Sequence, residues 1–122
     1  MSNSLYHAKS SANKWGGTWE DYIEIHQWLD ASKEMFGDVR HRALRHHTQG
    51  CFEAQEKFGV AITVGKREVP VRDIVEQHIV EDLGFLPTLG WWLDQMQIHP
   101  AMSGTKRREI RNTSDIFRSK NG

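Results

Sequence analysis

The residues with the clearest chemical potential are two pairs of histidine and aspartate, His26 with Asp30 and His78 with Asp82. The members of each pair lie four residues apart. On a helix such residues share one face, with their Cβ atoms about 5–6 Å apart. At that separation both side chains can reach one metal ion, or the carboxylate can orient the imidazole. The two pairs therefore predict either metal ligands or oriented histidines.

A third segment adds the adjacent histidines His46 and His47. Imidazole and carboxylate groups from several helices are the ligands that Zn, Mn or Fe take inside helical bundles. The predicted ligands of one divalent ion are His26, Asp30, His46, His47, His78 and Asp82. The alternative is a structural histidine network without metal, because buried polar clusters can be retained for the packing they specify.

Two arginines and a glutamate could allow a metal ion at this site to catalyse a reaction. A bound divalent ion lowers the pKa of a water molecule toward about 7 and supplies a hydroxide nucleophile. Arg42 and Arg72 would neutralise a phosphate, since guanidinium offers a planar bidentate fork, and Glu76 would act as general base. We therefore expect a metal-dependent hydrolase of a small phosphorylated substrate, a phosphoester or a nucleotide. For Arg42 the alternative is an ordinary solvated helix face.

Composition limits the class of protein. The chain has 122 residues, with 16 Lys and Arg against 16 Asp and Glu, and this length supports one core without a second domain. No apolar run reaches the roughly 18 residues of a membrane span, and the start lacks the apolar region of a secretory signal. We expect a cytoplasmic protein with no membrane partner. Cys51 is the single cysteine, so a disulfide framework is excluded.

Charge is divided unevenly along the chain. Residues 103–122 carry six basic against two acidic side chains, so we divide the protein into a helical domain over 1–102 and a basic, flexible tail over 103–122. Lys and Arg make most contacts to nucleic-acid phosphates, which makes residues 105–120 a candidate nucleic-acid-binding arm. The alternative is a solvated end of the chain without a partner.

Helix caps predict the first two helices, which must position the histidines and aspartates. Thr18 followed by Asp21 has the pattern of a capping box, which predicts a helix that ends at Gly37. Asp38 is a cap for a second helix, which carries the adjacent histidines and ends at Gly59.

Downstream, residues 60–71 have the turn and strand pattern of a β-hairpin. A third helix is predicted over 72–83 and a short last helix over 89–97, whereas residues 1–15 are expected to be irregular. The predicted fold class is mainly α, a compact bundle of about four helices with a small β-hairpin inserted between the second and third.

Several segments resemble one family. The sequences EDYIEIHQWLDASK (20–33), RHRALRHHTQG (40–50) and VPVRDIVEQHIVEDLGFLPT (69–88) are similar to small bacterial and phage proteins catalogued only as a domain of unknown function. The resemblance runs from about His7 to about Trp92. It implies a related fold and a bacterial or bacteriophage setting, and it attaches no reaction. It adds His7 to the positions that spacing had selected.

The aromatic pair Trp91 and Trp92 carries a second functional hypothesis. Such large rings usually serve packing, but an exposed apolar patch with a polar rim marks a site for a protein partner. In that case the chain would be a non-enzymatic phage or bacterial binding or inhibitor protein, and its histidines would be structural. The sequence leaves the oligomeric state open.

Overall fold

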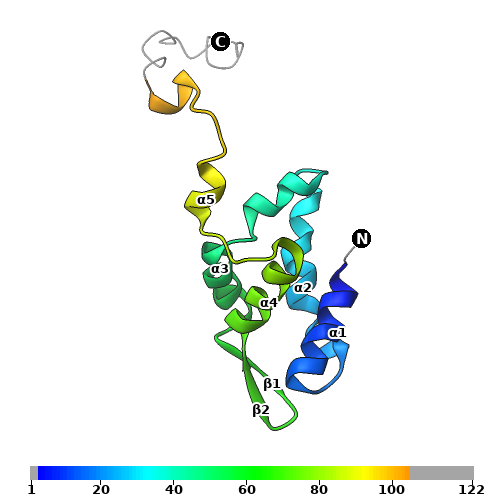
Figure 1. Ribbon diagram of the computed structural model, residues 1–122. Helices are drawn as coiled ribbons and strands as arrows, with labels where there is room; N and C mark the ends of the chain where they lie inside the picture. The colour runs from blue at the N-terminus through cyan, green and yellow to red at the C-terminus, as the bar shows by residue number, and fades with distance from the viewer. Residues whose placement is uncertain (1–2, 105–122) are drawn as a thin grey trace.

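Short helices make up most of residues 3–104, the part of the chain that the computed structural model describes (Figure 1). A two-stranded antiparallel hairpin interrupts them, so the prediction of a mainly helical fold with a small hairpin is confirmed. The α-helices and strands are α1 (Ser4–Trp15), α2 (Ile23–Asp30), α3 (Thr48–Phe58), β1 (Ala61–Val64), β2 (Arg67–Pro70), α4 (Val71–Leu83) and α5 (Leu89–Leu93). The 3-10 helices are Trp19–Asp21, Ala31–Glu34, Val39–Leu44 and Pro100–Ser103.

The start of the chain is helical, which corrects the expectation of irregular structure over residues 1–15. The Oδ1 atom of Asn3 accepts the backbone N–H of Tyr6 at 3.0 Å and so caps α1. The face of α1 that is buried carries His7, Ala8 and Ser11, with no large apolar side chain among them. Hydrophobic periodicity therefore could not reveal this helix, because its buried face is mostly polar.

The predicted second helix is divided into two parts. Asp38 does cap a helix, since its side chain accepts the N–H of Arg40, but that helix is the 3-10 segment Val39–Leu44. Helix α3 begins only at Thr48. Between them the backbone folds so closely that a Cβ atom at Gly50 would collide with the carbonyl oxygen of Arg45. A glycine is needed at this position because any side chain would push the turn apart.

The hairpin and the helix after it follow the prediction. Ala61 lies opposite Pro70 and Val64 opposite Arg67, with a tight turn between the strands. Helix α4 follows β2 directly and ends at Gly84, which adopts the left-handed conformation with φ of 87°. Helix α5 is shorter than the predicted segment 89–97.

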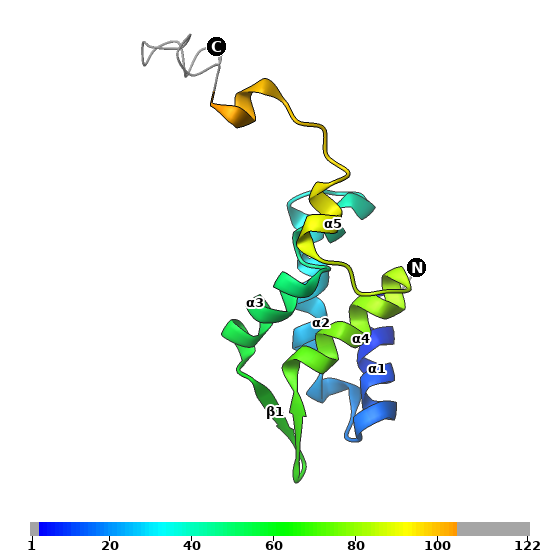
Figure 2. The ribbon, with the colours of Figure 1, turned by 60° about the vertical axis from the view of Figure 1, so that its left-hand side comes forward.

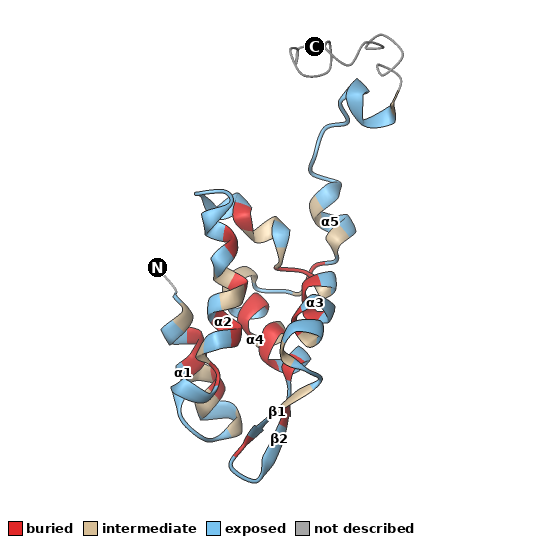
Figure 3. Ribbon diagram, turned by 180° about the vertical axis from the view of Figure 1, so that it is seen from behind, coloured by how far each residue is buried: buried red, intermediate tan, exposed pale blue. Residues whose placement is uncertain are grey.

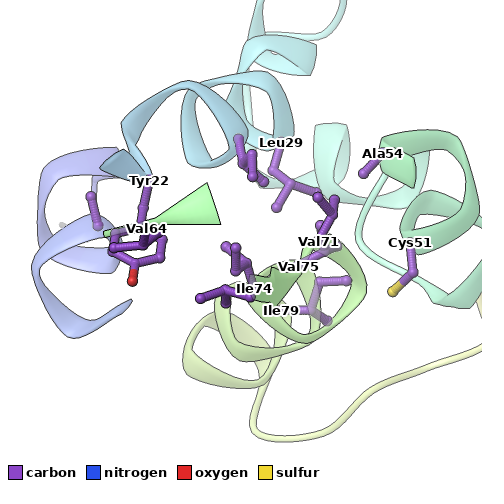
Figure 4. Close-up of a cluster of buried hydrophobic side chains, with 12 residues drawn as sticks. Tyr22, Leu29, Cys51, Ala54, Val64, Val71, Ile74, Val75 and Ile79 are labelled. Atoms are coloured by element: carbon purple, nitrogen blue, oxygen red, sulfur yellow. The ribbon is translucent and has the colours of Figure 1, made fainter. Parts of the chain in front are cut away.

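Helix α4 is the central element of the fold. It contacts α1, α2 and α3, which surround it (Figure 2). Its residues Ile74, Val75 and Ile79 are fully buried and meet Leu29 of α2 and Ala54 of α3 in the apolar core (Figure 4). Because every neighbouring helix packs on α4, its polar face is also brought into contact with them.

Burial is concentrated in the first four α-helices. Figure 3 shows buried residues on the facing sides of α1, α2, α3 and α4, whereas α5 and the segment after it are mostly exposed and lead away from the body.

Among the described residues, no helix combines the length and apolar character that crossing a membrane requires. Residues 105–122, which include the predicted nucleic-acid-binding arm, lie outside the described residues.

Candidate metal centre

Six of the seven histidines are buried, each with at most 2% of its surface exposed. An imidazole removed from water must find polar partners within the protein, so this number of buried rings requires an organised network. The buried histidines are His7, His26, His41, His46, His47 and His78.

Four side chains direct one ligand atom each toward a common point. These atoms all lie within 4.8 Å of one another, and together they could hold a metal ion. Asp30 is the last residue of α2, His46 lies just before α3, and His78 and Asp82 lie one turn apart on α4. We call these four residues, Asp30, His46, His78 and Asp82, the cluster.

The separations within the cluster match the shell of a metal ion. The Nε2 atom of His78 lies 3.2 Å from Oδ1 of Asp30 and 3.2 Å from Oδ2 of Asp82. The Nε2 atom of His46 lies 3.1 Å from Oδ2 of Asp82 and 4.0 Å from Oδ1 of Asp30. Four ligands about 2.0–2.1 Å from a tetrahedral ion lie about 3.3 Å apart. Neighbouring ligands of an octahedral ion at similar distances lie about 3.0 Å apart. The three shorter separations are close to both values, whereas the 4.0 Å separation of His46 from Asp30 is longer than either.

The outer carboxylate oxygens of the cluster have partners of their own. The Ser4 hydroxyl donates to Oδ2 of Asp30 at 3.0 Å. The Oδ1 atom of Asp82 lies 3.1 Å from Nε2 of His7 and 3.7 Å from the guanidinium of Arg42. Such outer contacts orient metal ligands and commonly accompany them in metal sites. Each aspartate therefore keeps one oxygen free to face the centre.

The Nδ1 atoms of the two cluster histidines, which face away from the centre, differ in their hydrogen bonding. The Nδ1 atom of His78 lies 2.9 Å from Nδ1 of His26. The Nδ1 atom of His46 is buried and has no hydrogen-bond partner among the described residues. The backbone of His46 is held instead, because the indole Nε1 of Trp92 donates to its carbonyl oxygen at 2.8 Å. One of the tryptophans considered for partner binding thus also supports the cluster.

The electrostatics give the ligands the protonation states that a metal ion needs. Burial raises the pKa of Asp82, but its contacts with His46, His7 and His78 outweigh burial and hold that pKa well below its usual range. The pKa of Asp30 is also lowered, because its contacts with His78 and Ser4 outweigh burial. Burial lowers the pKa of His46 despite its contact with Asp82. Ionised carboxylates and a neutral imidazole are the forms that bind metals.

Two of the predicted ligands lie outside the cluster. The Nδ1 atom of His47 accepts the backbone N–H of Gly50 at 3.0 Å, so this side chain caps α3. His26 lies behind His78 and contacts it through the Nδ1 atoms rather than facing the centre. The structure thus brings together four of the six predicted ligands and gives the other two neighbouring positions.

The three predicted catalytic residues, Arg42, Arg72 and Glu76, do not lie together at the cluster. Arg42 lies beside Asp82, with 27% of its side chain exposed. Arg72 and Glu76 pair with each other at 2.9 Å along α4, and the guanidinium of Arg72 lies over the ring of Phe52. Neither residue belongs to the cluster. Of the three, Arg42 is the one that pairs with a cluster residue, Asp82.

Sequence reasoning missed the polar residues that support the cluster from α1 and α4. Ser4, His7 and Ser11 recur at helical spacing on one face of α1, and Gln77 and Glu81 lie next to the cluster residues of α4. The resemblance had suggested His7, but a helix over residues 4–15 was needed to unite it with the two serines. Counting polar as well as apolar periodicity would have found this face.

Comparison with known protein families assigns the chain to one family. The family model described as Domain of unknown function (DUF6915) matches residues 2–102, a range that holds all four cluster residues. No curated protein and no solved structure matches the chain. Because the match extends over most of the sequence, the protein belongs to the family Domain of unknown function (DUF6915).

Proposed function

We propose that this protein binds one divalent transition-metal ion in the cluster and acts as a hydrolase of a small phosphoester or nucleotide. The observation that carries the proposal is the convergence of two imidazole nitrogens and two carboxylate oxygens within 4.8 Å of one another. Zn, Mn and Fe all accept this combination of ligands.

The spacing of these atoms is compatible with the ligands of one metal ion. Charge-assisted N–H···O bonds are usually about 2.7–2.9 Å long. The contact between Nδ1 of His7 and Glu81, outside the cluster, has this length at 2.7 Å. The cluster contacts of His46 and His78 with Asp82 are longer, at 3.1 and 3.2 Å. These lengths are near ligand–ligand separations around a shared ion, and they are also close to that of the hydrogen bond between His7 and Asp82, at 3.1 Å.

The hydrolase part of the proposal rests on access and charge. The side chain of Asp30 is 19% exposed and that of Arg42 is 27% exposed, whereas His46 and His78 are fully buried. A substrate anion that approaches the cluster on the side of Asp82 would meet the Arg42 guanidinium, which lies 3.7 Å from that carboxylate and suits phosphate. A bound ion would supply an activated water molecule. Arg72 and Glu76 stay candidates without a contact to the cluster.

The first experiment measures metal content. Tag-free protein is loaded with Zn²⁺, Mn²⁺ or Fe²⁺, dialysed, and analysed by elemental mass spectrometry alongside Asp82→Asn and His99→Gln. His99 is the exposed histidine outside the buried network, so it is a matched control for histidine loss. We expect one equivalent of metal in the wild type and His99→Gln, and none in Asp82→Asn. Absence of stoichiometric metal from the wild type in all three cases would refute the proposal.

The second experiment tests hydrolysis. The metal-loaded protein is assayed against p-nitrophenyl phosphate and a panel of nucleotides, with Arg42→Ala and Arg40→Ala compared. Arg40 is an exposed arginine paired with Asp38, away from the cluster, and serves as the control. We expect turnover that falls about 100-fold in Arg42→Ala, the effect of losing a group that stabilises developing charge, and that is unchanged in Arg40→Ala. Metal binding without turnover of any phosphorylated compound would leave only the metal site.

A second candidate function rests on an apolar groove of about 640 Å³. Exposed Met35, Leu44 and Met96 line it together with Trp91 and Trp92, which is the kind of surface a protein partner covers. In this function the chain is a binding protein. Binding of an apolar fluorescent dye that is lost in Leu44→Asp, with metal content unchanged, would favour it. Equal dye binding by both forms would count against it.

A further inference from the structure

A row of four side chains runs from the cluster into the interior. Its first link joins Nδ1 of His78 to Nδ1 of His26 at 2.9 Å. His26 Nε2 then lies 2.8 Å from the hydroxyl of Ser11, which lies 2.5 Å from Oε1 of Gln77. His78, His26 and Ser11 have no exposed surface. Because each link needs one donor and one acceptor, the protons in this row can be placed one after another.

The amide of Gln77, at the end of the row away from the cluster, determines which atoms donate and which accept along the row. Its Nε2 group donates to the carbonyl oxygen of His7 at 3.1 Å and to Oε1 of Glu81 at 2.7 Å. Both partners are acceptor oxygens, so the amide nitrogen must face them and Oε1 must face Ser11. An amide oxygen cannot donate. The Ser11 hydroxyl also lies 3.1 Å from the carbonyl oxygen of His7, so it gives its one proton to one of two oxygens that cannot donate, that of Gln77 or that of His7.

The proton positions on the two histidines follow. Since the Ser11 proton is already used, its oxygen accepts from His26, which must carry a proton on Nε2. His26 is fully buried and, among the described residues, no carboxylate is hydrogen-bonded to it, so nothing offsets the cost of burying a charged ring and His26 holds a single proton. Its Nδ1 atom is then an acceptor. The Nδ1 atom of His78, 2.9 Å away, must be the donor.

We infer that Ser11, His26 and Gln77 are positioning residues that set the tautomer of His78, with the proton on Nδ1 and the lone pair of Nε2 facing the cluster. That lone pair lies 3.2 Å from an oxygen of Asp30 and 3.2 Å from an oxygen of Asp82. It repels both unless a metal ion lies between them. Ser11, His26 and Gln77 thus prepare His78 as a ligand without themselves belonging to the cluster.

The test compares two alanine substitutions at fully buried serines. Ser11→Ala breaks the row. Ser32→Ala is the matched control, because the Ser32 hydroxyl lies 2.7 Å from Nδ1 of His41 and so makes the same kind of contact outside the row. Zn²⁺ affinity is measured by calorimetry, and thermal melts check that both variants fold. We expect Ser11→Ala to bind Zn²⁺ about 10–100-fold more weakly and Ser32→Ala to bind as the wild type does.

A second readout does not depend on metal. In metal-free protein labelled with ¹⁵N-histidine, two-bond ¹H–¹⁵N NMR spectra report which ring nitrogens carry protons. We expect a protonated Nδ1 on His78 in the wild type and in Ser32→Ala, and a changed signal in Ser11→Ala. Conversion of Ser11 to threonine, which keeps the hydroxyl, should restore the wild-type signal.

The inference rests on the proposed metal site for its effect on affinity, and the two can fail separately. If the wild type binds Zn²⁺ and the two alanine variants bind it equally well, the inference is wrong and the metal site stands. An unprotonated Nδ1 on His78 in the wild type would also overturn it. If the wild type binds no metal while Ser11→Ala still shifts the His78 signal, the metal proposal fails and the tautomer assignment holds.

Discussion

The Nε2 atom of His7 lies 3.1 Å from Oδ1 of Asp82, 75 residues further along the chain. The other ring nitrogen of His7 lies 2.7 Å from Oε1 of Glu81. Burial lowers the pKa of His7, but the hydrogen bonds to Asp82 and Glu81 outweigh it, so the pKa is raised. A protonated His7 that donates to both carboxylates ties α1 to α4. It also leaves Oδ2 of Asp82 free for the cluster.

Replacement of His7 by glutamine should therefore destabilise the protein. The side chains of His7 and Asp82 are only 1% and 3% exposed, and removal of one partner of such a pair costs about 3 kcal/mol. The free energy of unfolding is measured by urea titration. His99→Gln, at an exposed histidine, is the control and should change little. Equal stabilities of the two variants would show that the contact of His7 with Asp82 is not formed.

Stability should fall in acid because of His26. Its pKa is about 2 in the folded protein and about 6.5 when unfolded, so the neutral ring stabilises the fold above pH 6.5. Below that pH the unfolded chain gains a proton that the folded protein excludes. The loss is about 1.4 kcal/mol per pH unit, or about 2 kcal/mol between pH 6.5 and 5. Burial also lowers the pKa of His46 and His47, which adds loss in the same direction.

This pH dependence is measured by urea unfolding at several pH values in the presence of a chelator. The His26→Gln variant, which has no ring to protonate, should show a shallower dependence than the wild type. His7 acts with the opposite sign, because its raised pKa adds stability in acid that is lost as the pH rises. Identical slopes for the wild type and His26→Gln would mean that His26 is protonated in the fold.

Removal of metal should lower the melting temperature. A ligand present at about 100 times its Kd stabilises the folded state by about 2.7 kcal/mol. Differential scanning calorimetry with and without chelator should show this shift in the wild type. Asp82→Asn lacks a cluster ligand, so its melting temperature should not respond to the chelator. A response of equal size in both proteins would place the ion elsewhere.

Gly50→Ala should disturb both fold and cluster. The new methyl group would meet the carbonyl oxygen of Arg45, in the turn that places His46 before α3. Such a clash costs about 3 kcal/mol and should also weaken Zn²⁺ binding. Gly37→Ala is the matched control, because a Cβ atom there meets nothing within 4 Å. The prediction is wrong if both variants unfold at the same urea concentration.

Cys51 should be chemically inert in the folded protein. It is buried with 1% exposure, and burial raises the pKa of its thiol to about 11. The thiolate is the reactive form, so iodoacetamide at pH 8 should leave the native protein unmodified and label it after unfolding in urea. Mass spectrometry measures the mass added to Cys51 by alkylation. Rapid labelling of the native protein would reveal an accessible, activated thiol instead.

The sequence alone determined the local elements. The i,i+4 spacing of His78 and Asp82 placed both on one face of α4, and Gly84 marked the end of that helix. The hairpin followed from its turn at Gly65. These features depend on residues close together in the chain, where helix geometry and backbone sterics act without help from distant segments.

Only the tertiary structure decided which polar residues meet. Neighbours in sequence such as His46 and His47 take different positions, one in the cluster and the other as the cap of α3. His26 shared the spacing pattern of His78 and yet lies behind it, 52 residues away in the chain. A buried imidazole must be paired by whatever donors and acceptors the packed helices bring to it. Those partners come from α1, α2 and α4, which lie far apart in the sequence, so no local pattern predicts these contacts.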